Sequence, residues 1–121
     1  HQYAVVSVPS FVQRACAAAL DTDTASMRAL FRRRRDYVCG RLDAMGLPAK
    51  RPEGAFYVFP DIRRYGMGSE AFCRKMLKEG LVGALPGVYF GTEGFIRLSY
   101  CYSEEDLQVG LDRIEAFLGT L

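Results

Sequence analysis

The residue in this chain best suited to chemistry is one arginine inside a short apolar run near its end. Residues 95–100 read FIRLSY. Successive side chains of a β-strand alternate between two faces, so Arg97 lies opposite Ile96 and Leu98. A planar guanidinium there can bind a carboxylate through two parallel hydrogen bonds. We therefore predict that Arg97 binds a carboxylate, against the commoner outcome that a strand arginine faces solvent or pairs with a structural acid.

Two glycine-containing segments offer weaker candidates. Residues 54–57 read GAFY, and a small residue before aromatic ones lets the backbone approach a ligand, although a hairpin packed with aromatic rings has the same pattern. Gly54 is the candidate in this segment. Residues 85–91 read LPGVYFG, whose glycine spacing fits neither the dinucleotide-binding nor the phosphate-loop pattern. That segment predicts a turn and not an anion site.

The other reactive residue types argue against catalysis within this chain. The sole histidine is His1, so a histidine-activated serine and a histidine-rich metal site are excluded. The acidic residues show no spacing typical of a general-acid pair. The cysteines lie far apart without metal-ligand spacing, which predicts buried, reduced thiols. They are Cys16, Cys39, Cys73 and Cys101. The sequence predicts neither a catalytic residue nor a metal site.

A run of four basic residues raises a separate hypothesis of anion binding. Residues 32–35 read RRRR, and thirteen of the sixteen basic residues are arginines, at a net charge of +2. Successive helical residues are rotated by about 100°, so the four side chains spread around the axis, whereas phosphate binding needs clustered charge. We predict a solvated helix face with Arg34 on its apolar side, and no nucleic-acid partner.

The predicted helices are placed by apolar periodicity and capping residues. The Ala-rich residues 9–20 predict a largely buried helix. Residues 21–23 (DTD) offer capping oxygens for a longer helix, with Met27 in its apolar stripe, that stops at Gly46. Ser69 is the expected cap of a helix over residues 70–79.

The last helix has the clearest signal. Ser103 is the expected cap, and Asp106 completes a capping box three residues later. Apolar residues recur at helical spacing, which predicts one face packed on a sheet. They are Leu107, Leu111, Ile114 and Leu118.

Short extended segments lie between these helices. Residues 49–51 and 55–59 predict a hairpin with its turn at residues 53–54. Residues 81–85 predict a short buried strand, and the strand of Arg97 follows. Helices that flank three to four short strands predict an α+β fold, in which the helices pack on a small sheet.

Length and composition limit the class of protein. The chain has 121 residues, half apolar and a quarter charged, as expected for one globular domain over residues 1–121. It has no apolar run long enough to cross a bilayer and no signal-peptide pattern, so we expect a soluble, cytoplasmic protein without a membrane partner. Because the sequence does not begin with Met, we expect a fragment of a longer chain.

Three segments together resemble the C-terminal part of a known enzyme family, the pyridoxal-phosphate aminotransferases of class I, the aspartate aminotransferase family of fold type I. They are residues 52–60 (PEGAFYVFP), 85–91 (LPGVYFG) and 96–100 (IRLSY). The likeness covers nearly the whole chain and implies the fold of the small C-terminal domain. It implies that Arg97 binds the α-carboxylate of an amino-acid substrate, and that Phe90 and Gly91 lie near that substrate.

The same resemblance implies a cofactor and partners. In this family pyridoxal 5'-phosphate is bound mainly by residues that precede the matched part, including the lysine to which it is joined, so this chain alone is expected to be inactive. The substrates would be an amino acid and a 2-oxo acid. The complete protein would be a homodimer, with residues 1–20 as a connecting or interface segment.

Two other interpretations stay open. The chain could be a stand-alone, non-catalytic binding or interaction module that uses the basic residues 32–35. It could also be the small domain of a related pyridoxal-phosphate lyase or synthase, since these enzymes share the same scaffold and carboxylate-binding arginine.

Overall fold

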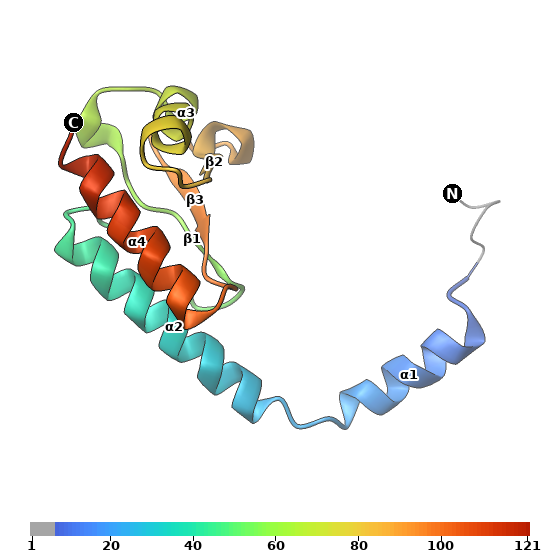
Figure 1. Ribbon diagram of the computed structural model, residues 1–121. Helices are drawn as coiled ribbons and strands as arrows, with labels where there is room; N and C mark the ends of the chain where they lie inside the picture. Colours follow the sequence, from blue (N-terminus) through green and yellow to red (C-terminus); the bar gives the residue numbers. More distant parts are fainter. Residues whose placement is uncertain (1–6) are drawn as a thin grey trace.

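Within residues 7–121, which the computed structural model describes, the chain forms four α-helices and a small sheet (Figure 1). The helices are α1 (Ser10–Leu20), α2 (Ala25–Ala44), α3 (Ser69–Glu79) and α4 (Glu104–Leu118), with the short 3₁₀ helices η1 (Arg63–Tyr65) and η2 (Gly87–Phe90). The strands are β1 (Tyr57–Val58), β2 (Leu85–Pro86) and β3 (Ile96–Ser99). The predicted α+β fold with a small sheet of short strands is confirmed.

Strand β3 is the centre of the sheet, and both neighbouring strands run antiparallel to it. The strand order is β1-β3-β2, and Tyr57 of β1 pairs with Ser99 of β3. The predicted alternation of side chains along β3 is confirmed. Ile96 and Leu98 are buried, whereas Arg97 and Ser99 on the opposite face are half-buried. The sheet therefore fixes the backbone that carries Arg97 from both edges.

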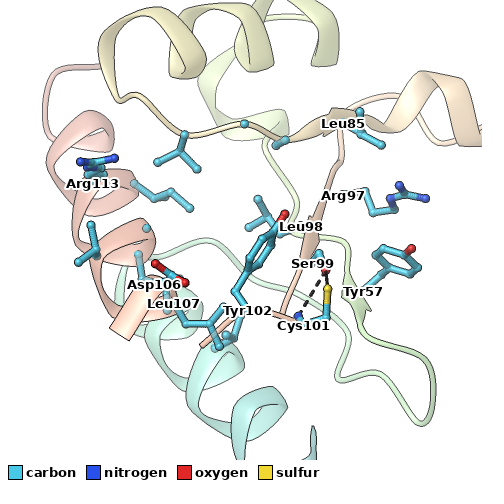
Figure 2. Close-up of a pocket in the computed structure, with 18 of the residues that line it drawn as sticks. Tyr57, Leu85, Arg97, Leu98, Ser99, Cys101, Tyr102, Asp106, Leu107 and Arg113 are labelled. Carbon is cyan, nitrogen blue, oxygen red and sulfur yellow. Dashed lines mark hydrogen bonds between the residues drawn. The ribbon is translucent and has the colours of Figure 1, made fainter. Parts of the chain in front are cut away.

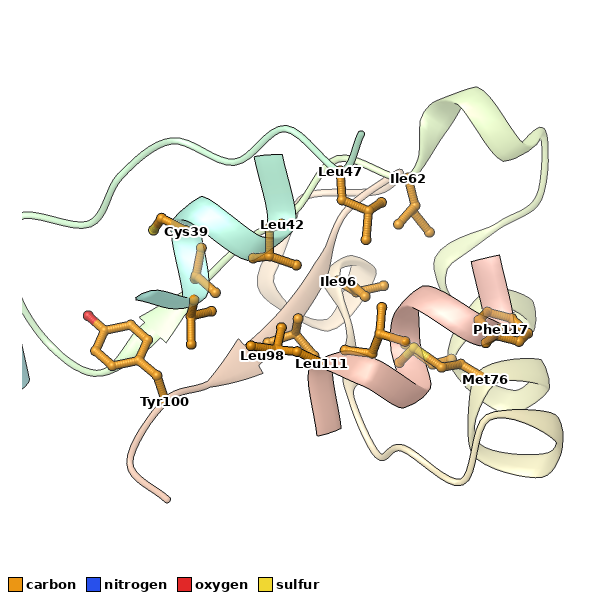
Figure 3. Packing of buried hydrophobic residues seen from close by; sticks show 14 of the residues in the cluster. Cys39, Leu42, Leu47, Ile62, Met76, Ile96, Leu98, Tyr100, Leu111 and Phe117 are labelled. Atoms are coloured by element: carbon orange, nitrogen blue, oxygen red, sulfur yellow. The ribbon is translucent and has the colours of Figure 1, made fainter. Parts of the chain in front are cut away.

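The core lies between the buried face of the sheet and the helices. Figure 1 shows α2 and α4 side by side and α3 next to β2. Leu42 of α2, Met76 of α3 and Leu111 of α4 belong to one buried cluster with Ile96 and Leu98 of β3 (Figure 3). The predicted stripe of α4 faces this core, since its first three residues are buried and the fourth is half-buried. They are Leu107, Leu111, Ile114 and Leu118.

Polar caps and a glycine set the ends of two helices as predicted. The Asp23 carboxylate accepts a hydrogen bond from the Ala25 N–H at 2.8 Å at the start of α2. Gly46, with φ of 72°, follows the end of that helix. The Ser103 hydroxyl oxygen accepts the Asp106 N–H at 3.0 Å, which caps the start of α4, and the hydroxyl donates to the Asp106 carboxylate at 2.8 Å.

The predicted burial of the first helix is wrong. Helix α1 contains no buried residue, and Phe11 is 73% exposed. Figure 1 shows α1 standing apart from the body of the molecule, so its Ala-rich composition has no core to pack into. Met27 in the first part of α2 is also exposed, because α2 packs on the body through Val38 and Leu42 further along. Between residues 7 and 121, no helix is both long and apolar enough to span a bilayer.

The predicted hairpin around residues 53–54 is also wrong. Within residues 49–51, only Ala49 forms a β-bridge, and its partner is Pro60. Strand β1 pairs with β3 and not with residues 49–51. Side chains from elsewhere bind the backbone between these segments and hold it as an irregular loop. Arg35 donates to the Pro52 carbonyl at 3.2 Å, and the Tyr100 hydroxyl donates to the Ala55 carbonyl at 3.0 Å.

Two further boundaries differ from the prediction. Residues 81–85 were expected to form a buried strand, but β2 starts at Leu85, and Leu81 is 66% exposed. Leu81 has a positive φ of 55° and is not extended backbone, which ends any strand there, while Val82 packs against the core. Helix α3 starts at Ser69 and not after it, with Gly68 at the capping position.

The prediction that all four thiols are buried holds for Cys39 and Cys73 only. Cys16 on α1 and Cys101 after β3 are exposed. Burial raises the pKa of the Cys73 thiol to about 11 and also raises the pKa of Cys39, so the reactive thiolate is scarce near neutral pH. Residues 7–121 contain no cluster of side chains suited to a metal ion.

We therefore expect two classes of cysteine in the folded 121-residue chain. A disulfide reagent at neutral pH should modify Cys16 and Cys101 rapidly, because they are exposed, and Cys39 and Cys73 only after denaturation, because burial blocks access to them and raises their pKa. Cys16→Ser and Cys101→Ser variants should each remove one rapid equivalent in a spectrophotometric thiol titration. Rapid modification of Cys73 in the folded chain would contradict this burial.

Candidate functional site

Arg97 lies between two aromatic rings. Its guanidinium carbon Cζ is 4.2 Å from the ring centre of Tyr57 and 4.3 Å from the ring centre of Phe90. Both distances are well within the range of a cation–π contact. Figure 2 shows Arg97 and Tyr57 together on the side of β3 opposite Leu98. The N–H donors of a guanidinium lie in its plane, so rings over its faces leave the donor edge free.

The pairing register explains why the two rings arrive from opposite sides. Tyr57 pairs with Ser99, so it shares the face of the sheet on which Arg97 lies. Phe90 ends η2, which directly follows β2 at the other edge of β3, where Leu85 pairs with Arg97. Because β1 and β2 flank β3 on opposite edges, the sheet itself assembles this arrangement.

Each of the two rings is supported by another aromatic residue. Phe59 contacts Phe90 edge to face, with ring centres 5.7 Å apart and an interplanar angle of 86°. The ring of Phe56 lies 4.4 Å from that of Tyr57. Aromatic pairs of this kind contribute about 0.5–1.5 kcal/mol beyond the burial of their area. The rings beside Arg97 therefore have fixed neighbours of their own.

The tight turn after β2 holds η2 in place. The buried Gly87 donates its N–H to the Phe95 carbonyl at 2.8 Å and accepts the Thr92 N–H at 3.0 Å. A Cβ atom on Gly87 would lie 2.2 Å from the Thr92 carbonyl oxygen and 2.4 Å from that of Phe95, so only glycine fits. Gly91, with φ of 73°, then ends η2 directly after Phe90.

One carboxylate joins this loop to helix α3. Glu93 accepts hydrogen bonds from the Ser69 N–H at 2.6 Å and from the Ser69 hydroxyl at 2.8 Å. The Ser69 hydroxyl oxygen accepts the Val88 N–H at 3.3 Å, so η2 is part of the same network. The hydrogen bonds from the Ser69 backbone and hydroxyl lower the pKa of Glu93 below its usual value of 4.5.

We expect this carboxylate to make the stability of the chain depend on pH. Because the pKa of Glu93 is lower in the folded chain than in the unfolded chain, its stabilising contribution is present above pH 4.5 and is lost as the pH falls through the folded value. Glu93→Gln should lower the free energy of unfolding at pH 7 and reduce its loss on acidification, as measured by urea unfolding. Glu53→Gln, at an exposed position in a loop, is the control. The same loss on acidification in Glu93→Gln and in the unmodified chain would contradict this role.

No carboxylate within residues 7–121 pairs with Arg97. Arg41 shows the opposite case, because its guanidinium contacts Asp112 at 2.7 Å and Glu115 at 3.0 Å. A half-buried guanidinium without an acidic partner is a favourable place for an incoming carboxylate, since the charges then satisfy one another.

The structure brings together some of the predicted site residues and not others. Phe90 contacts Arg97, and Gly91 follows it at the end of η2. Gly54 is exposed in the loop before β1, with no atom within 4 Å of a Cβ built there, so the structure does not bring it to Arg97. Tyr57 is a site residue that the sequence analysis did not name. The strand pattern places it beside Phe56, but the register of β1 against β3 is a tertiary feature.

A surface cleft of about 850 Å³ lies beside β3, between the segment before β2 and helix α4 (Figure 2). Arg97 and Tyr57 border this cleft, whose wall is largely apolar. Its apolar residues include Leu81, Val82, Leu85, Leu98, Leu107 and Val109. Its acidic residue, Asp106, already accepts a hydrogen bond from the Ser103 hydroxyl at the start of α4. The cleft therefore adds apolar surface next to Arg97, and it adds no acidic side chain that pairs with the guanidinium.

The lysines of the chain do not join this site. Lys50, Lys75 and Lys78 are absent from the lining of the cleft and from the contacts around Arg97. Lys75 pairs with Glu79 at 3.0 Å within α3. Among the described residues, the surroundings of Arg97 therefore include no lysine side chain.

The arginines of residues 32–35 diverge around α2 as the helix geometry predicts. Arg33 lies 4.0 Å from Glu104 in an exposed pair, and Arg35 pairs with Asp36 at 2.8 Å. Arg34 lies over the Phe31 ring at 5.7 Å. Their charges are thus directed to different neighbours and do not form one stripe.

Comparison with known proteins assigns the chain to a family. Residues 2–114 match the family described as aminotransferase class I and II. The chain is 42% identical to a probable N-acetyl-LL-diaminopimelate aminotransferase of Bacillus subtilis, over 98% of this chain and 31% of that protein. It is 41% identical to aromatic-amino-acid aminotransferase 2 of Thermococcus litoralis, over 90% of this chain and 30% of that protein.

Solved structures agree with this assignment. The aromatic aminotransferase of Pyrococcus horikoshii superposes with a TM-score of 0.86 at 42% identity, over 92% of this chain and 32% of that one. The aspartate aminotransferase of Thermotoga maritima superposes with a TM-score of 0.86 at 39% identity, over 93% of this chain and 29% of that one. The chain therefore spans about a third of the length of these relatives. It belongs to the class I and II aminotransferase family.

Proposed function

We propose that this chain is the substrate-carboxylate-binding C-terminal domain of an enzyme that transfers an amino group between an amino acid and a 2-oxo acid. The observation that carries the proposal is Arg97, a half-buried guanidinium without an acidic partner in residues 7–121, held between Tyr57 and Phe90. Both substrates of such a reaction carry a carboxylate next to the reacting carbon. One arginine can therefore orient either substrate.

Pyridoxal 5'-phosphate is the cofactor that the family implies. When bound, it supplies an electron sink for chemistry at the substrate α-carbon. Since the lysines of this chain do not join the Arg97 site, we assign the cofactor-binding residues and the covalent lysine to the rest of a longer protein. The role left to this chain is to bind and orient substrate, and we expect it to be inactive alone.

The relatives favour amino transfer over the alternatives. The protein from Bacillus subtilis and the two structures with a TM-score of 0.86 described above are named aminotransferases. A lyase or synthase on the same scaffold would use the same arginine, so the reaction itself must be measured. A stand-alone module built on residues 32–35 has less support, because Arg35 and Arg34 have neighbours within the chain.

The proposal includes an interface role for the start of the chain. Helix α1 exposes Phe11 and Leu20, which is apolar surface suited to contact with another part of a longer protein or with a second copy. The proposed connecting segment begins before α1, and its first six residues lie outside the described part. The homodimer and the cytoplasmic location stay predictions.

The proposed function is tested with the complete protein and a panel of amino acids, each matched with the amine that lacks only its α-carboxylate. Pyruvate and 2-oxoglutarate serve as amino-group acceptors. We expect amino transfer from at least one amino acid, with kcat/KM about 10- to 150-fold above that of the matched amine, from the loss of a charged hydrogen-bonded pair. Equal values would overturn the carboxylate role, and product formation without amino transfer would overturn the reaction.

A further inference from the structure

We propose that Tyr57 and Phe90 are positioning residues, which fix the plane of the Arg97 guanidinium so that its donor edge meets the substrate carboxylate. The inference rests on the proposed function of Arg97, and it adds two residues whose aromatic rings determine how well that arginine binds. Neither ring needs to contact the substrate for this role.

The distances distinguish this arrangement from the other contacts between cations and rings in the described residues. Arg34, Arg63, Arg64 and Lys75 each lie over one ring, at 5.3 to 5.7 Å from its centre. Arg97 has two rings, at 4.2 and 4.3 Å. A separation near 4 Å brings the flat guanidinium against the ring face, as in stacking. The guanidinium of Arg97 therefore lies closer to its aromatic partners than the other cations do, and it has two such partners.

Two such rings reduce the freedom of the side chain before a ligand arrives. An arginine side chain has several rotatable bonds, and ordering it costs free energy that would otherwise be lost from binding. Because Tyr57 and Phe90 approach from opposite edges of β3, they restrict the guanidinium from both sides. The aromatic partners of these rings, Phe56 and Phe59, hold them in turn.

The rings also change the surroundings of the charge. The aromatic rings on both sides cover part of the guanidinium surface, and a hydrogen bond between charged groups is stronger where water has less access. The free donor edge then favours a planar anion in the plane of the guanidinium. A carboxylate fits this requirement because both of its oxygens lie in one plane.

The alternative is that the rings merely pack against the chain of Arg97 and stabilise the fold. The two roles make different predictions for a double-mutant cycle. A positioning residue acts through Arg97, so its loss should have no effect on ligand binding once Arg97 is removed. A residue that supports only the fold should weaken binding by the same factor in either background.

The test measures the dissociation constant of 2-oxoglutarate by calorimetry in the complete protein, with no turnover needed. Tyr57→Leu and Phe90→Leu should each raise it about 3- to 10-fold, the loss expected for one cation–π contact. In the Arg97→Leu background, the same two substitutions should change the dissociation constant less than about twofold, because the residue through which they act is absent. Tyr57→Phe keeps the ring and should restore the affinity of the unmodified protein.

Tyr89→Leu is the matched control. Tyr89 also lies in η2, is 66% exposed, and donates its hydroxyl to Glu70, away from the contacts of Arg97. Thermal unfolding of each variant checks that the fold is retained. If Arg97→Leu weakens binding but the two ring variants do not, or if their effects persist in the Arg97→Leu background, the positioning role is overturned and the function of Arg97 stands. If Arg97→Leu leaves the dissociation constant unchanged, or the unmodified protein binds neither 2-oxoglutarate nor pyruvate, both are overturned.

Discussion

Replacing Arg97 with leucine is expected to raise the KM for the amino acid and for the 2-oxo acid together. Both ligands would present a carboxylate to the same donor edge, and the hydrogen bonds to a charged group are worth about 1.5–3 kcal/mol, or roughly 10- to 150-fold in affinity. A lysine at this position keeps the charge but loses the planar fork and the stacking on Tyr57 and Phe90. We expect Arg97→Lys to recover only a small part of the affinity.

The measurement is a steady-state comparison of both half-reactions in the complete protein. A uniform loss for all carboxylate substrates, with the matched amines unaffected, is the expected signature of a lost carboxylate contact. The control is Arg113→Leu, because Arg113 lines the same cleft from α4 on the other side of β3 (Figure 2). Saturation by the amino acid at the same concentration in the Arg97→Leu and unmodified proteins would remove Arg97 from the site.

Gly87→Ala is expected to give the largest loss of stability among single substitutions in the loop before β3. The added Cβ would lie 2.2 Å from the Thr92 carbonyl oxygen and 2.4 Å from the Phe95 carbonyl oxygen, both in the backbone, so neither can move without breaking the turn. Overpacking of this kind costs about 1–3 kcal/mol, and backbone neighbours favour the upper end. Because Phe90 follows in η2, we also expect weaker carboxylate binding.

Urea unfolding of the 121-residue chain measures the first effect, and the dissociation constant of 2-oxoglutarate in the complete protein measures the second. Gly83→Ala is the matched control, since a Cβ at that position would meet no atom within 4 Å. It should change the free energy of unfolding by less than about 1 kcal/mol, the usual scale of a glycine-to-alanine change at an unstrained site. Equal stability of the Gly87→Ala and Gly83→Ala variants would contradict the packing described for this turn.

Local signals in the sequence predicted the elements whose stabilising contacts are themselves local. The cap that Ser103 forms on the Asp106 N–H and the stop at Gly46 involve residues within a few positions of each other, and both appear in the structure. Elements held by distant residues were predicted less well. Residues 49–59 do not form a hairpin, because Arg35 and Tyr100 bind the intervening backbone.

Burial was the other property that local pattern could not determine. Helix α1 has an apolar composition but no neighbour in the described residues that covers it, so its predicted burial failed while its predicted boundaries held. Ser69 was predicted as a cap by its position before α3. The capping oxygen comes instead from Glu93, 24 residues away in the sequence. A distant carboxylate can replace a local cap because only its position in space matters.

The sequence by itself determined that Arg97 lies on a strand face opposite Ile96 and Leu98, because alternation is a property of the strand alone. It also determined the α+β class, through helical periodicity and capping. Only the tertiary structure decided which rings flank the guanidinium. Tyr57 and Phe90 are separated from Arg97 by 40 and 7 positions in the sequence and reach it because β1 and β2 pair with opposite edges of β3, a register that no local pattern specifies.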